Sequence, residues 1–228
     1  MNENRLKRLV QLAEKKLAAE PAEVVEMWRL LKDLTNELLL EAGFSERAVK
    51  ALHTKFNDAG RRSAPWKAFS SKVPGRPQDG SDGNRINRWL MPTEHKFYAT
   101  EKDATLVQIR YYLQTLSMVG APGLPLPELK TSFHWLTGHA IEPGLYEDPI
   151  QLIPLELKPF LENPRSLTSG HLFPLDRGGK HVPENAYLML YRSNQLQGNM
   201  TLEELVDLMK RLVERHAQRA VKGTSLGQ

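Results

Sequence analysis

The chain has 228 residues and no cysteine, with a net charge of +4 at pH 7 and a pI near 9.2. The missing cysteines exclude disulfides, thiolate zinc sites and cysteine nucleophiles, so any bound metal must have oxygen or imidazole ligands. No stretch of about 18 apolar residues occurs, so we expect no membrane partner and a cytoplasmic location.

The first 60 residues have the apolar periodicity of consecutive helices. Apolar residues from Leu6 to Leu17 recur at helical spacing, Pro21 opens a second helix that ends at Gly43, and Ser45 is an N-cap for a third. The stripe from Leu6 to Leu17 suits either a homodimer contact or packing within the monomer.

Residues 60–91 contain seven basic residues against two aspartates, so this window is +5 and the rest of the chain is −1. Trp66, Phe69 and Trp89 lie between those charges. Such a segment suits contact with nucleic-acid phosphates, or it is a solvated linker whose aromatic rings pack on neighbouring helices. The first interpretation predicts DNA contacts by Arg61, Arg62, Lys67, Lys72, Arg76, Arg85 and Arg88.

The middle of the chain continues with one more helix and a proline-rich break. Residues 102–119 predict an amphipathic helix, and APGLPLPELK at 121–130 is a candidate boundary. Beyond it we expect a short strand and turn at 133–141 and an apolar connector at 150–161. We therefore predict a helical region at 1–125, for DNA recognition or dimerisation, and a second domain at 126–222.

Residues 167–216 have the order strand, wide loop, strand, helix. The first strand ends near His171, the loop contains Gly178 and Gly179, and 186–191 is an almost wholly apolar run typical of a buried strand. A capping box formed by Thr201 and Glu204 begins the helix.

This arrangement resembles the HNH, or ββα-metal, nuclease superfamily. The resemblance rests on Gly170-His171-Leu172-Phe173-Pro174, the Gly178-Gly179 loop, Asn185, and Asn194 with Gly198 four residues later. It covers about 50 residues and implies that His171 is the general base, that Asn185 braces the loop, and that Asn194 is a metal ligand.

Two features depart from the family pattern. Many members have an aspartate or histidine before the base as a second metal ligand, where this chain has Gly170, and many have zinc-binding cysteines. The Gly-His-Leu-x-Pro form looks like the branch in which one asparagine holds a largely hydrated ion, so we expect one Mg²⁺ or Mn²⁺ and no structural zinc.

The remaining site assignments come from the chemistry of phosphodiester hydrolysis. A neutral histidine can take a proton from water near neutral pH. Arg177, in the loop facing the base, is our first choice to steady the phosphate as a catalytic residue, and Lys180 is a further DNA contact. His181 is either a second phosphate contact or a solvated loop residue, and Glu203 or Glu204 could touch a metal-bound water.

The resulting expectation is a mainly helical α+β protein, with a helical N-terminal region followed by a ββα-metal nuclease domain whose catalytic unit spans 168–216. Its implied activity is metal-dependent cleavage of double-stranded DNA by a restriction-type enzyme. Two alternatives stay open: a low-specificity nicking or phage and mobile-element genome-processing nuclease, and a non-cleaving DNA-binding module with a decayed site. A homodimer would suit cutting of a palindrome.

Overall fold

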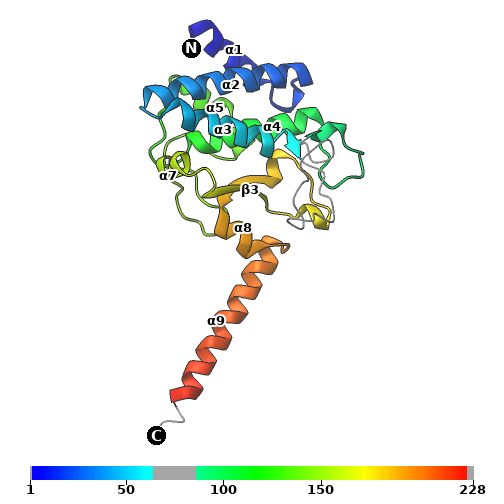
Figure 1. Cartoon of the computed structure of the whole chain (residues 1–228), viewed down its shortest axis with the longest axis vertical. Helices are drawn as coiled ribbons and strands as arrows, with labels where there is room; N and C mark the ends of the chain where they lie inside the picture. The colour runs from blue at the N-terminus through cyan, green and yellow to red at the C-terminus, as the bar shows by residue number, and fades with distance from the viewer. Residues whose placement is uncertain (1, 64–85, 225–228) are drawn as a thin grey trace.

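The computed structural model describes residues 2–63 and 86–224, with side chains described up to residue 220 of the last helix. Its fold is mainly helical with two small antiparallel sheets, which confirms the α+β class (Figure 1). The helices are α1 (Glu3–Glu14), α2 (Pro21–Glu41), α3 (Glu46–Ala59), α4 (Glu101–Leu116), α5 (Pro127–Ser132), α6 (His134–Thr137), α7 (Leu157–Glu162), α8 (Tyr191–Gln197) and α9 (Leu202–Thr224). The strands are β1 (Arg62–Ser63), β2 (Ile86–Asn87), β3 (Leu167–His171) and β4 (Ala186–Leu190).

Local capping signals begin the helices of the N-terminal half. Asn2, Ser45 and Thr100 each accept a hydrogen bond from a backbone N–H in the first turn of α1, α3 and α4. At the start of α2, Glu20 and Glu23 form a reciprocal capping box around Pro21. These starts agree with those expected from the sequence.

Helix α4 is the centre of the molecule. Every residue from Ala104 to Leu116 is buried, and α4 packs against α2, α3, α6 and β4. The helix itself was predicted correctly, but the polar face expected to be exposed to solvent is wrong, because the polar residues of α4 are buried as well. Two of them, Arg110 and Gln114, face the second sheet, where Arg110 stacks over the Tyr187 ring at 4.3 Å.

The apolar stripe of α1 packs within the monomer. Leu6, Leu9 and Leu12 are buried where α1 packs on α2 and α5, whereas Leu17 lies past the helix and is 58% exposed. The dimer contact suggested for this stripe is wrong, since its side chains already belong to the core.

Short helices occupy the region beyond the proline-rich break. The strand and turn expected at 133–141 are wrong, because α5 and α6 lie there, and the 150–161 connector contains the start of α7. Trp135 of α6 has a structural role: its Nε1 donates to the backbone oxygen of Ala13, 3.1 Å away. The hydrophobic core is continuous from Leu6 to Leu188, so both predicted regions share it.

The two sheets are small, and one helix leaves the body. Strands β1 and β2 pair at the two ends of the basic segment, and β3 and β4 form a second pair with His171 opposite Ala186. Helix α9 projects from the body with the C-terminus at its far end (Figure 1). No helix among the described residues is both long and apolar enough to cross a membrane.

Candidate functional site

The β3–β4 pair is fixed at its outer edges by buried polar side chains. Outward-facing backbone groups of a two-stranded sheet need partners when they are buried. The Leu188 N–H donates to Gln114 Oε1 at 3.0 Å, and the Leu188 carbonyl accepts from the Tyr146 hydroxyl at 2.6 Å. On the other strand, Lys55 Nζ donates to the Leu167 carbonyl at 2.8 Å. The hairpin is thereby held rigidly against α3 and α4.

The end of β4 is held by a buried aspartate. Asp148 is fully enclosed, and its carboxylate accepts from the N–H groups of Leu190, Ile150 and Gln151 at 2.7–2.9 Å. It also accepts from the Ser193 hydroxyl at 2.9 Å, in the first turn of α8. Asp148 therefore fixes the junction from which α8 begins.

His171 lies at the end of β3 in a relay of two imidazoles. Its Nε2 is 2.9 Å from Nδ1 of His181, and Nε2 of His181 is 2.9 Å from the carbonyl oxygen of Gly60. A carbonyl only accepts, so Nε2 of His181 carries a proton, and in neutral His181 the Nδ1 atom is an acceptor. His171 must then donate from Nε2, which leaves its Nδ1 as an unprotonated base.

The environment keeps both rings neutral. Burial, followed by the positive charge of Arg88, lowers the pKa of His171 from 6.5 to about 3. Burial, Arg88 and His171 together hold the pKa of His181 well below 6.5. At neutral pH the tautomers assigned above are therefore the populated forms.

His181 is a buried structural partner of the base. Its exposed fraction is 1%, so the expectation of a solvated loop residue or a phosphate contact is wrong. The carbonyl that holds it, at Gly60, lies where α3 meets α4: a Cβ added at Gly60 would come within 2.7 Å of Gln108 Cβ. Only glycine allows this close approach, and the relay is thus anchored on the central helix.

Two predicted DNA contacts are instead packed inside the protein. Arg88 is 6% exposed, and its guanidinium donates to the carbonyls of Ala59, Gly60 and Phe97. The Arg61 guanidinium lies over the rings of Trp28 and Trp89, at 4.8 and 5.0 Å, and pairs with a carboxylate of α4.

Both guanidiniums are held by partners within the protein, so Arg61 or Arg88 would have to give up these partners to contact DNA. Arg62 and Lys180 are exposed. Lys67, Lys72, Arg76 and Arg85 lie outside the described residues.

The two motif asparagines have different surroundings. The Asn185 Oδ1 atom accepts from the Phe173 N–H at 2.7 Å, and its Nδ2 donates to the carbonyls of Phe173 and Lys180, each at 2.9 Å. This amide is fully used across the wide loop. Within residues 2–63 and 86–220, no protein group hydrogen-bonds to the side chain of Asn194, so its amide oxygen is free to bind an ion.

Asn194 lies within α8, a short helix between β4 and α9 that was not expected from the sequence, and it precedes α9, the helix expected after Thr201. The chain turns into helix at Tyr191, directly after β4, and α8 packs on both strands. A Cβ added at Gly170 would lie 2.9 Å from Asn194 Oδ1, and 2.6 Å from the Met189 side chain. The Asn194 amide therefore lies beside the residue that precedes His171, and any larger residue at position 170 would displace it.

A buried glutamine that the sequence did not single out joins α8 to the end of β3. Gln197 is 1% exposed, and its Nε2 donates to the carbonyls of His171 and Leu172 at 3.0 and 2.8 Å. Residues 191–197 are mostly polar, so nothing in the sequence indicated that this amide is buried and therefore needs partners.

Arg177 is already engaged at the loop surface. Its guanidinium pairs with Glu204, which raises the pKa of Arg177. Glu204 also accepts from the backbone N–H of Thr201 in the capping box that begins α9. A phosphate would thus have to compete with Glu204 for Arg177, and Glu204 is less suited to touch a metal-bound water.

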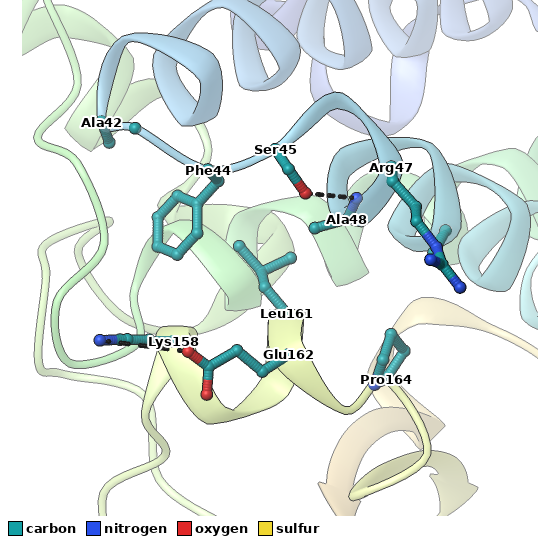
Figure 2. Close-up of a pocket in the computed structure, with 11 residues that line it drawn as sticks. Ala42, Phe44, Ser45, Arg47, Ala48, Lys158, Leu161, Glu162 and Pro164 are labelled. Carbon is teal, nitrogen blue, oxygen red and sulfur yellow. Dashed lines mark hydrogen bonds and ion pairs between the residues drawn. The ribbon is translucent and has the colours of Figure 1, made fainter.

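Acidic and imidazole side chains do not gather into a metal site within the described residues. In the described part of the chain, no group of three or more histidine, aspartate or glutamate side chains could hold an ion. A hollow of about 840 Å³ lies between α7 and the loop that enters α3, with Lys158 and Glu162 paired along one wall at 4.0 Å (Figure 2). None of the residues predicted for the active site lines it.

A solved structure has the same arrangement of elements. It is described as "Crystal structure of a type II restriction endonuclease", and it aligns with a TM-score of 0.53 and 17% identity over 79% of this chain and 82% of that chain. The two chains share a fold. No protein-family model and no curated protein matches this sequence.

Proposed function

We propose that this protein is a divalent-metal-dependent DNA endonuclease of the HNH type, with β3, β4 and α8 as its ββα unit. The observation that carries this proposal is the relay from His171 through His181 to the Gly60 carbonyl, which leaves Nδ1 of His171 unprotonated at the end of β3. The unused amide of Asn194, beside the preceding residue, supports it.

In this mechanism the base is His171, and its Nδ1 removes a proton from the attacking water. His181 is a positioning residue, because it fixes the tautomer and the ring orientation of His171. The low pKa of His171 keeps Nδ1 free before substrate binds. A phosphate bound nearby would raise that pKa, since a negative charge stabilises the imidazolium formed when the proton is transferred.

Asn194 is the proposed ligand of one Mg²⁺ or Mn²⁺, because Mg²⁺ prefers oxygen ligands and keeps several waters. The ion, when bound, would stabilise negative charge on the phosphate and on the leaving oxygen. Asn185 cannot share this role, since both atoms of its amide are occupied by the loop. Its part is to hold that loop around the base.

Exposed basic residues would bind the DNA backbone. Lys180 lies next to His181 in the wide loop, Arg62 lies in β1, and residues 64–85, between β1 and β2 in the chain, contain four basic residues against two aspartates. Arg177 would contact phosphate after release from Glu204. These contacts neutralise phosphates and predict binding that weakens as salt rises.

A restriction-type enzyme is the more specific form of the proposal, supported by the fold shared with a type II restriction endonuclease. A low-specificity nuclease would use the same residues. The second candidate function is a DNA-binding module that no longer cleaves. It is favoured by Gly170, since the close contacts there leave no room for a second carboxylate ligand.

Cleavage of supercoiled plasmid in Mg²⁺, Mn²⁺ or EDTA tests the proposal. We expect metal-dependent conversion to nicked and linear DNA, lowered roughly 100- to 10,000-fold by His171→Ala, the usual contribution of a general base. The variant Asn194→Ala should weaken Mn²⁺ binding measured by titration calorimetry. His134→Ala, which removes an exposed histidine of α6, is the matched control and should cleave normally.

The outcomes separate the candidates. Discrete fragments indicate a site-specific enzyme, and a smear indicates low specificity. DNA binding without cleavage by the folded wild type in either metal would establish the DNA-binding module. Cleavage that survives both His171→Ala and Asn194→Ala would overturn the assignment of the site.

A further inference from the structure

Helix α9 has an apolar stripe that the body does not cover. Of the stripe, Leu205 is buried, but Leu202, Val206, Met209 and Val213 are 36–69% exposed. From Met209 to residue 220 every residue is exposed, and the helix extends alone into solvent (Figure 1).

A partner is needed to explain such a helix. The exposed stripe continues through Leu212 and reaches His216, and Lys210 and Glu214 lie at its edge, where they line the same groove as Met209 and Val213. Helices in water gain most of their stability from packing an apolar face, and large exposed apolar patches on proteins mark interaction sites. The face from Leu202 to Ala220 covers 19 residues, so α9 presents it over about 27 Å.

The charges of α9 are divided between its two halves. Residues 202–209 contain three acidic residues and no basic one, whereas residues 210–220 contain four basic residues and one acidic. The two halves are therefore −3 and +3. Two copies in antiparallel orientation set each acidic half against a basic half, whereas parallel copies set like charges together. The acidic residues are Glu203, Glu204 and Asp207, and the basic ones are Lys210, Arg211, Arg215 and Arg219.

Side-chain size has the same complementarity. The large apolar residues of the stripe run from Leu202 to Val213, and near the body Ile150 and Leu196 extend them into an apolar groove with Leu202 and Val206. The distal half has Ala217 and Ala220 on this face. Antiparallel copies would set Ala217 and Ala220 of one helix against the large residues near the body of the other, which favours close packing at both ends of the contact.

We propose that α9 pairs in antiparallel orientation with α9 of a second copy of this chain, forming a two-fold dimer with one body at each end of the helix pair. In this orientation each body would lie near the free end of its partner's helix. The contact is isologous, so one surface serves both copies. This inference does not depend on the nuclease assignment.

Sedimentation equilibrium of the full chain tests the proposal. We expect a monomer–dimer equilibrium that weakens at high salt. Replacing Met209 and Val213 with glutamate should raise the dimer dissociation constant by about 100-fold or more, because each charge would be buried unpaired. Gln218→Glu adds the same charge on the polar face and should leave the constant nearly unchanged.

Charge reversal tests the orientation by a second route. Reversing the acidic half with Glu203→Lys and Asp207→Lys should weaken the dimer, and so should reversing the basic half with Arg215→Glu and Arg219→Glu. The chain carrying all four changes should dimerise again, since its halves are once more opposite in sign.

The absence of native cysteine allows a clean crosslinking experiment. Singly substituted Val206→Cys and Ala217→Cys chains, mixed and oxidised, should give the mixed disulfide faster than either symmetric one. Circular dichroism checks that each variant is folded. A folded wild type that stays monomeric, including one that binds anionic lipid vesicles as a monomer, would overturn the proposal. Preferred symmetric disulfides would do the same.

Discussion

Replacing His181 tests most directly whether its hydrogen bond fixes the tautomer and orientation of His171. In His181→Leu the side chain keeps most of its volume but can neither accept from His171 nor donate to Gly60. The Gly60 carbonyl keeps its hydrogen bond from Arg88 at 2.9 Å, so the main loss falls on the Nε2–H of His171. Leaving one partly buried donor unpaired costs about 1–3 kcal/mol.

That cost predicts the kinetic effect. If this free-energy cost raises the transition state, the cleavage rate should fall roughly 5- to 150-fold. The KM for DNA should change little, since His181 touches no substrate. His181→Gln is the conservative variant, because an amide offers one acceptor and one donor at a spacing close to that of the two ring nitrogens. It should recover most of the rate.

Nitrogen NMR of histidine-labelled protein reports the same relay without activity. In the wild type, the His171 signals should show Nε2 protonated and Nδ1 unprotonated at neutral pH, and His181→Leu should yield a mixture of tautomers. If folded His181→Leu kept both the wild-type rate and a single His171 tautomer, the positioning role of His181 would be refuted.

Three further predictions concern stability and the metal site. Asp148→Ala removes an acceptor of four hydrogen bonds, so we expect a loss of about 3 kcal/mol and a drop in Tm of roughly 6–12 °C by calorimetry; an unchanged Tm would contradict the structural role. Gly170→Asp should lower Tm and displace Asn194 rather than create a better metal site, so tighter Mn²⁺ binding by this variant would show the reasoning to be wrong. Because the folded-state pKa of His171 is about 3, the unfolded chain binds more protons below pH 6.5, and stability should fall from pH 6.5 toward pH 3. His171 accounts for about 2 kcal/mol of that loss at pH 5, so urea titrations of His171→Gln should show a flatter dependence on pH than those of the wild type.

The sequence predicted elements well where local signals were strong. Ser45 and Pro21 predicted where two helices begin, and the apolar run at 186–191 predicted a buried strand, which the structure has at 186–190. It failed at 133–141, where short helices form because packing on α1 and α4 outweighs weak local preference. It also failed to show that α4 is buried on every side, since the partners of Gln114 lie far away in the chain.

The candidate site divides in the same way. Residue type and order along the chain were enough to single out His171, Asn185 and Asn194 as a set, because the motif is defined by residue types at characteristic spacings in the sequence. Neither the burial of His181 nor the packing of Arg61 and Arg88 could be predicted from residue type and order. A histidine, lysine or arginine is expected to be solvent-exposed unless its neighbours in the fold are known.

The sequence by itself determined the fold class of the protein, the presence of a hairpin followed by helix, and a set of candidate side chains for the proposed chemistry. Tertiary structure alone decided which of them are available. Gly60 and His181 lie 121 positions apart and meet only because α3 and the wide loop both pack beside α4. Tautomer, burial and the exposure of α9 all depend on such long-range contacts, because they are properties of an environment and not of a residue.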